Sequence, residues 1–287
     1  MIWQKILEKG SSILAEAGIE EADVDARELL MYYKKWNWTD LLMNRSQESS
    51  PEETEDYLQL IEKRASHTPL QHLTGEQEFM GYLFRVTGDV LVPRQDTEIL
   101  CEEVIKAAEK KAGKGGAGLK ILDMCTGSGC IAISLKKELP YAEVTAADLS
   151  DKALSIARQN AEANDAEINF RQGNLFEALN ESDTEFDLIV SNPPYIPAEE
   201  IETLTPEVKD HDPRMALDGG LDGLDFYRRI AEESYKYMKK DGELFLEIGA
   251  PQGEDVKRLL EENSFSDCRV IQDLAQLDRV VTGRNHR

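Results

Sequence analysis

A strand-like stretch ends in a rigid, uncharged segment whose residue types could hold a planar amino group. The sequence DLIVSNPPYIP places Asn192 and Tyr195 on either side of Pro193 and Pro194. Each proline holds the residue before it in extended geometry, and neither has a backbone N–H, so the segment offers carbonyl acceptors without donors between them. The side-chain oxygen of Asn192 and the carbonyl of Pro193 could accept both hydrogens of one NH₂ group while the Tyr195 ring stacks on it. These four residues are the predicted catalytic site, and they suit an amide or an exocyclic base amine.

The chemistry that such a clamp serves is transfer of a group to a poor nucleophile. An amide nitrogen is unreactive because its lone pair is delocalised into the carbonyl. Holding both N–H bonds orients the nitrogen and favours its pyramidalisation, so in-line positioning does most of the catalysis. A dedicated general base is unnecessary, since the proton becomes acidic once a methyl group is attached. The alternative interpretation of the segment is a rigid turn that ends a strand.

A glycine pair upstream predicts a cofactor loop. In LDMCTGSGC, Gly127 and Gly129 stand where a strand turns into a helix, which requires unusual dihedrals and lets a ligand touch backbone. With Ala132 they also fit the GxGxxA dinucleotide pattern, so a dinucleotide enzyme and a purely structural turn stay open as alternatives. Asp148, about 20 residues further on, ends the next expected strand and could accept from both ribose hydroxyls. Asp123 suits a cofactor that carries an amino group, and this combination favours S-adenosylmethionine over NAD.

The third expected strand ends in GNLF. Asn174 could bond an adenine edge there, with Leu175 and Phe176 supplying apolar contact. The alternative is a strand-end turn with two core residues.

The elements that must position these residues fall into three parts. Residues 1–72 are predicted to form a small helical domain, with a capping-box start at Ser50 and Glu53. Glycines break residues 73–92 into short strands, which predicts a β-hairpin linker. In the third part, residues 93–287, strands and helices alternate, which predicts an α/β fold with a doubly wound, mostly parallel sheet. Ligands bind such sheets beyond the carboxyl ends of the strands, where all the motifs above lie.

The third part is expected to contain the following elements. Strands are predicted at 119–124, 142–149, 167–173, 186–192, 242–249, 267–272 and 279–283. Helices are predicted at 97–112, 129–138, 150–163, 224–239 and 252–263.

The charge, hydrophobicity and cysteine content of the chain limit the kinds of partner that we expect. The formal net charge is −23, with 56 acidic residues against 33 basic ones. Nucleic-acid binding needs Lys and Arg to neutralise phosphates, so we expect no stable nucleic-acid binding. The acidic surface is explained by solvation alone or, as a more specific alternative, by a basic protein partner. No apolar run approaches the roughly 18 residues of a membrane span, and charges interrupt the N-terminal segment, so a cytoplasmic location without membrane contact is expected. The four cysteines form no CxxC pair and do not cluster with the four histidines, so no metal is expected.

Several segments make the chain resemble the HemK/PrmC family of release-factor glutamine methyltransferases over nearly its whole length. They are PLQHLTGEQEFMG, VLVPRQDTE, LDMCTGSG, SNPPYIP, DPRMALDGGLDGLDFYRRI, FLEIGAPQG and DRVVTGR, in the family's order. The resemblance implies a seven-stranded class I methyltransferase sheet, S-adenosylmethionine as cofactor, and an N-terminal domain that helps hold the substrate. It also implies the reaction: methylation of the side-chain nitrogen N5 of the glutamine in the Gly-Gly-Gln motif of class 1 peptide chain release factors.

The family's functional positions carry over residue by residue. The substrate clamp is Asn192 to Tyr195, and Arg94 and Thr97 shape the site. With Asp123, the predicted cofactor-binding residues are Cys125, Thr126, Gly127, Ser128, Gly129, Asp148, Asn174, Leu175 and Asn192.

Three positions depart from the family's usual pattern. Cys125 and Gln276 stand where glycine is common, and Asn174 stands where aspartate is common. Cofactor binding should survive at Asn174, because its amide oxygen still accepts. The leading alternative function is a methyltransferase acting on an exocyclic amine of a DNA or RNA base; a catalytically silent scaffold is a further one.

Overall fold

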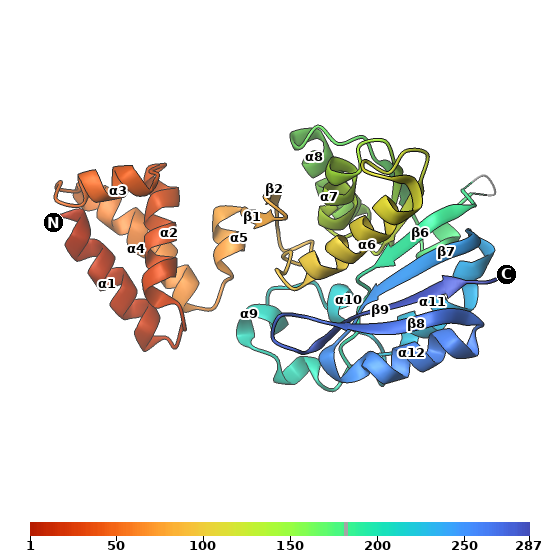
Figure 1. The fold of residues 1–287 in the computed structure, drawn as a ribbon. Helices are drawn as coiled ribbons and strands as arrows, with labels where there is room; N and C mark the ends of the chain where they lie inside the picture. Colours follow the sequence, from red (N-terminus) through yellow and green to blue (C-terminus); the bar gives the residue numbers. More distant parts are fainter. Residues whose placement is uncertain (181–182) are drawn as a thin grey trace. The chain divides into compact units, whose positions relative to one another are not determined.

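The chain divides into two compact units, each described here by itself. The computed structural model describes residues 1–180 and 183–287 (Figure 1). The first unit consists of Met1–Glu76 and Thr205–His211, and the second of Gln77–Leu204 and Asp212–Arg287. The inclusion of Thr205–His211 in the first unit brings together segments far apart in the sequence, which the sequence pattern did not predict.

The first unit is helical, as expected. Its helices are α1 (Trp3–Glu16), α2 (Ala22–Lys34), α3 (Trp38–Asn44), α4 (Pro51–Ala65), α5 (Leu70–Thr74) and the short α9 (Pro206–Lys209). The predicted capping box starts α4: the Ser50 hydroxyl accepts from the Glu53 N–H, and the Glu53 carboxylate accepts from the Ser50 N–H. The hairpin was expected to begin at 73, but Leu73 and Thr74 belong to α5, which Gly75 ends in the left-handed region at φ +79.

One buried arginine explains why Thr205–His211 joins this unit. Arg64 is only 5% exposed, and its Nε donates to Asp25 at 2.6 Å. Its Nη2 donates to Glu207, also at 2.6 Å. A buried guanidinium needs partners for its donors, so Glu207 ties the later segment to α4.

The second unit is built on a seven-stranded sheet, which confirms the predicted fold class. Its strands are β3 (Lys120–Met124), β4 (Glu143–Asp148), β5 (Asn169–Gln172), β6 (Phe186–Ser191), β7 (Met238–Glu247), β8 (Phe265–Gln272) and β9 (Asp278–Asn285). Their order is β5-β4-β3-β6-β7-β9-β8. All neighbours are parallel except β9, which runs antiparallel to both β7 and β8. A separate hairpin, β1 (Glu76–Phe79) and β2 (Tyr82–Arg85), forms a two-stranded sheet.

Helices cover both faces of the large sheet (Figure 1). They are α6 (Thr97–Ala112), α7 (Cys130–Glu138), α8 (Asp151–Ala163), α11 (Asp225–Glu233) and α12 (Gly253–Glu262). The short helix α10 (Arg214–Leu217) precedes α11 in the chain. Along β6, Leu188 and Val190 pack in the core beneath α6 and α7, while Ile189 packs in the opposite core beneath α11 and α12. This alternation follows from the two-residue period of a strand, and burial on both faces explains why β6 reads as a continuous apolar run.

One predicted helix was too long. The helix expected at 224–239 ends at Glu233, and a 3₁₀ turn (Ser234–Lys236) leads into β7. Met238 pairs with Phe186 of β6, so sheet pairing claims residues whose apolar spacing also fits a helix. Within the described residues, no helix is long and apolar enough to cross a membrane.

Candidate active site

A cavity opens at the carboxyl ends of β3, β4 and β6, within the second unit. Its volume is about 860 Å³, counted with its open mouth. The predicted site residues that line it are Cys125, Thr126, Gly127, Ser128, Asp148, Asn192 and Pro194, together with Arg94 and Thr97. Asp123, Gly129, Asn174, Leu175, Pro193 and Tyr195 are not part of the lining. The position is the one expected for ligands of parallel sheets.

The loop after β3 has an unusual backbone. Cys125, Gly127 and Gly129 all lie in the left-handed region, at φ values of +63, +53 and +83. Cys125 therefore holds a side chain in a backbone conformation that favours glycine. A Cβ on Gly129 would lie 3.0 Å from the Cβ of Ala157, so Gly129 allows α8 to approach closely and does not reach the cavity.

Asp123 holds this loop from beneath. The residue is fully buried, and its Oδ2 accepts from the Thr126 hydroxyl at 2.5 Å and from the Ala132 N–H at 3.2 Å. Burial raises the pKa of Asp123 to about 7. The predicted contact with a cofactor amino group required this carboxylate at the cavity surface, whereas here it shapes the loop.

Asp148 presents a carboxylate to the cavity. Its Oδ2 accepts from the Gly127 N–H and its Oδ1 from the Ser150 N–H, both at 2.8 Å. Burial raises the pKa of Asp148, while these two backbone donors oppose the rise. Each oxygen keeps further acceptor capacity, so the pair can receive two hydroxyl groups.

The residues of the GNLF segment do not line the cavity. Asn174 Oδ1 accepts from Arg229 Nη1 at 2.9 Å. Leu175 and Phe176 are buried in the core, and the Phe176 ring stacks on Tyr237 with centroids 4.8 Å apart. Leu175 and Phe176 therefore lie where the alternative interpretation, a strand-end turn with two core residues, placed them.

Two of the four clamp residues line the cavity and two do not. Asn192 and Pro194 line the cavity, and Asn192 Nδ2 donates to the Thr97 hydroxyl at 3.4 Å. Pro193 is buried, and Tyr195 is half-buried. Burial raises the pKa of Tyr195 to about 12, which keeps its hydroxyl neutral at physiological pH.

Glu247, at the end of β7, lies near Asn192 and Thr97 without lining the cavity, and the sequence analysis gave it no role. It is 2% exposed, and burial raises its pKa to about 7 against the opposing effects of the neighbouring Thr97, of the Arg279 charge and of Asn192. Its carboxylate therefore belongs to the polar group that holds Asn192. The available signal was an acidic residue closing the apolar run of GELFLEIG.

Arg94, which lines the cavity, is held by an ion pair with a buried aspartate. Its Nη2 donates to Asp212 Oδ2 at 2.7 Å, and the Asp212 side chain is 1% exposed. This ion pair links the segment before α6 to the segment before α10. Pro213, Met215 and Ala216 from that second segment line the cavity. They lie in the DPRMALDGGLDGLDFYRRI segment that carries the family resemblance, but the sequence analysis gave them no role.

The sheet order, the glycine loop, the acid that ends β4 and the NPPY segment after β6 together define a class I methyltransferase. Solved structures share the fold. A methyltransferase from Pyrococcus furiosus superposes with a TM-score of 0.51 at 17% identity, covering 71% of this chain and 89% of that one. The T. Thermophilus 16S rRNA N2 G1207 methyltransferase gives a TM-score of 0.53 at 20% identity, covering 74% of this chain and 50% of that one.

Sequence comparison is more specific. Residues 5–75 match the PrmC N-terminal domain, and residues 96–208 match the methyltransferase small domain. The release factor glutamine methyltransferase of Geobacter sulfurreducens is 42% identical over 99% of this chain and 97% of its own length. That of Clostridium acetobutylicum is 38% identical over 95% of each chain. The chain belongs to the release factor glutamine methyltransferase family.

Proposed function

We propose that this protein transfers a methyl group from S-adenosylmethionine to the side-chain nitrogen N5 of the glutamine in the Gly-Gly-Gln motif of class 1 peptide chain release factors. The observation that carries the proposal is the position of Asn192, which lines the same cavity as the glycine loop and Asp148. Near-full-length similarity to relatives of that name supports the substrate. The proposal includes a cytoplasmic location, since translation termination takes place there.

The residues around the cavity fit the cofactor. A Cβ on Gly127 would meet nothing within 4 Å, so the loop leaves open space beside its backbone. Asp148 has capacity for two ribose hydroxyls, and the loop from Cys125 to Ser128 offers backbone to the rest of the ligand. When bound, S-adenosylmethionine supplies a methyl group on a positively charged sulfur. Asn174 and Leu175 do not line the cavity and are proposed to support the adenine side indirectly.

The clamp supplies the positioning that a weak nucleophile requires. Because Asn192 Nδ2 donates to Thr97, its Oδ1 is left to accept from the substrate amide. The proposal assigns the cavity to the cofactor, and it assigns the Pro193 carbonyl and the Tyr195 ring to the substrate. Two acceptors on one NH₂ group fix the direction of the nitrogen lone pair, and that alignment lowers the barrier without a general base.

Methylation of an exocyclic base amine is the second candidate, because the same clamp holds such an amine. The formal charge of −23 disfavours it, since phosphate binding needs cations. Incubation with unmodified release factor and, separately, with DNA and RNA, followed by mass spectrometry, decides between the two. The proposal expects one added methyl group on the glutamine of the Gly-Gly-Gln peptide, and a methylated base in its place would overturn it.

A further inference from the structure

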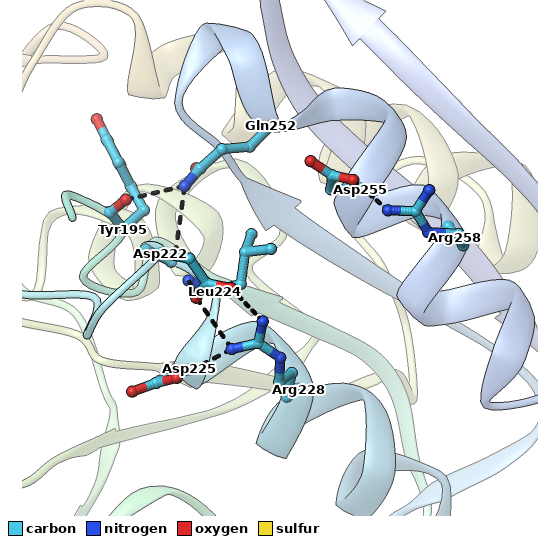
Figure 2. Close-up of polar contacts among 9 residues, drawn as sticks. Tyr195, Asp222, Leu224, Asp225, Arg228, Gln252, Asp255 and Arg258 are labelled. Carbon is cyan, nitrogen blue, oxygen red and sulfur yellow. Dashed lines mark hydrogen bonds and ion pairs between the residues drawn. The ribbon is translucent and has the colours of Figure 1, made fainter.

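The side chain of Gln252, just before α12, joins three backbone groups, and two of these contacts are drawn in Figure 2. Its Nε2 donates to the Tyr195 carbonyl at 2.9 Å and to the Gly223 carbonyl at 3.2 Å. Its Oε1 accepts from the Gly249 N–H at 3.0 Å. Gln252 is 8% exposed, so these bonds are largely shielded from water, and both amide hydrogens are committed.

The Gly223 end of this contact belongs to a loop that lies directly on the clamp backbone. Ile196 N–H donates to the Leu217 carbonyl, and the Gly219 N–H donates back to the Ile196 carbonyl, each at 2.9 Å. A Cβ on Gly219 would lie 2.8 Å from the Tyr195 Cα, and a Cβ on Gly223 would lie 2.4 Å from the Tyr195 carbonyl oxygen. Only a loop without side chains at these positions can approach so closely.

We propose that Gln252 is a positioning residue for methyl transfer, which fixes the Tyr195 backbone against the Gly219–Gly223 loop and thereby holds the substrate clamp in its working shape. The inference rests on the proposed function. Gln252 does not line the cavity, so its effect passes through Tyr195. Since Tyr195 is bonded to Pro194 within a stiff segment, movement of its carbonyl also shifts Asn192 and the acceptor pair.

Two substitutions separate positioning from a merely structural role. Gln252→Met keeps the size of the side chain and removes all three hydrogen bonds. Gln252→Glu keeps the acceptor for Gly249 but turns a carboxylate oxygen toward two carbonyls. Burial beside those carbonyls raises the pKa of the introduced acid, and its protonated form can donate to one of them. Gln159→Glu makes the same chemical change on the exposed face of α8, next to Arg85, and serves as the matched control.

We expect the Gln252 substitutions to lower kcat and to leave KM nearly unchanged. At pH 8, both Gln252 variants should lose kcat by about tenfold or more on release factor, while KM and S-adenosylmethionine affinity stay within about threefold. From about pH 8.5 to about pH 6 the activity ratio of Gln252→Glu to wild type should rise, and that of Gln252→Met should stay flat. Glu247, Asp278 and Arg279 lie near this contact and are present in every variant, so the ratio removes their contribution.

Two outcomes would overturn the inference. One is a kcat within about twofold of wild type in both Gln252 variants. The other is a loss of cofactor affinity and melting temperature that matches the loss of kcat, with no recovery of Gln252→Glu at low pH, because that pattern reports general loss of folding. The wild-type protein in the same assay tests the proposed function separately: no methyl transfer by wild type would reject that function, whatever the variants do.

Discussion

The backbone N–H of Gly127 donates to Oδ2 of Asp148 at 2.8 Å, which joins the glycine loop after β3 to the end of β4. Both residues line the cavity. A ligand that binds the Asp148 carboxylate therefore also depends on the position of the glycine loop, because this hydrogen bond couples the two.

Asp148→Asn should weaken S-adenosylmethionine binding by about tenfold or more. The amide keeps one acceptor oxygen but places an NH₂ group where the second acceptor was, and hydrogen bonds to charged groups are worth about 1.5 to 3 kcal/mol. Isothermal titration calorimetry measures the change. Asp151→Asn, exposed at the start of α8, is the control and should bind normally. Equal affinities for the two variants would refute the ribose role of Asp148.

Asn192→Ala should keep cofactor affinity within about threefold and lose most of the methyl transfer, by about 100-fold or more. The substitution removes the acceptor oxygen that orients the substrate amide, while the loop and Asp148 remain. Calorimetry and single-turnover kinetics on release factor give the two quantities. Unchanged turnover would reject the clamp.

Asn174→Asp should stabilise the protein by up to about 1 kcal/mol, because it turns the hydrogen bond to Arg229 into an ion pair that is partly exposed. Urea unfolding measures the gain. Asn169→Asp on β5 adds the same charge at an exposed position and should give no gain. If both variants behave alike, Arg229 does not act on position 174.

Glu247→Gln should flatten the pH dependence of stability. Burial raises the pKa of Glu247 from 4.5 to about 7 in the folded protein, so its contribution is fully present below about pH 4.5 and is lost as the pH rises through about 7. Glutamine cannot ionise and keeps that contribution. Unfolding free energies measured from pH 4 to 8 should diverge in favour of the variant, by on the order of 1 to 3 kcal/mol at the upper end. Parallel curves would show that Glu247 does not titrate in this range.

The sheet, and the place of the NPPY segment directly after β6, could be predicted because they leave local signals. A strand buried on both faces is a continuous apolar run, and two prolines restrict the backbone wherever they stand. The direction of a side chain leaves no such signal: an acid at the end of a strand can face the cavity, as Asp148 does, or the loop beneath it, as Asp123 does.

Contacts between segments far apart in the chain could not be predicted from the sequence either. Gln252 meets Tyr195 across 57 positions, and Arg64 meets Glu207 across 143. Nothing in the sequence pairs Gln252 with the predicted clamp residue Tyr195, or Arg64 with Glu207. Only the fold shows that each contact has one buried partner, Gln252 in the first and Arg64 in the second, whose hydrogen bonds are therefore costly to lose.

The most direct test of the account is transfer of a labelled methyl group from S-adenosylmethionine to an unmodified class 1 release factor, compared with the same factor carrying glutamate in place of the Gly-Gly-Gln glutamine. The account predicts label on the first protein, confined to that glutamine, and none on the second. Equal labelling of the two proteins, or no label on either, would contradict it.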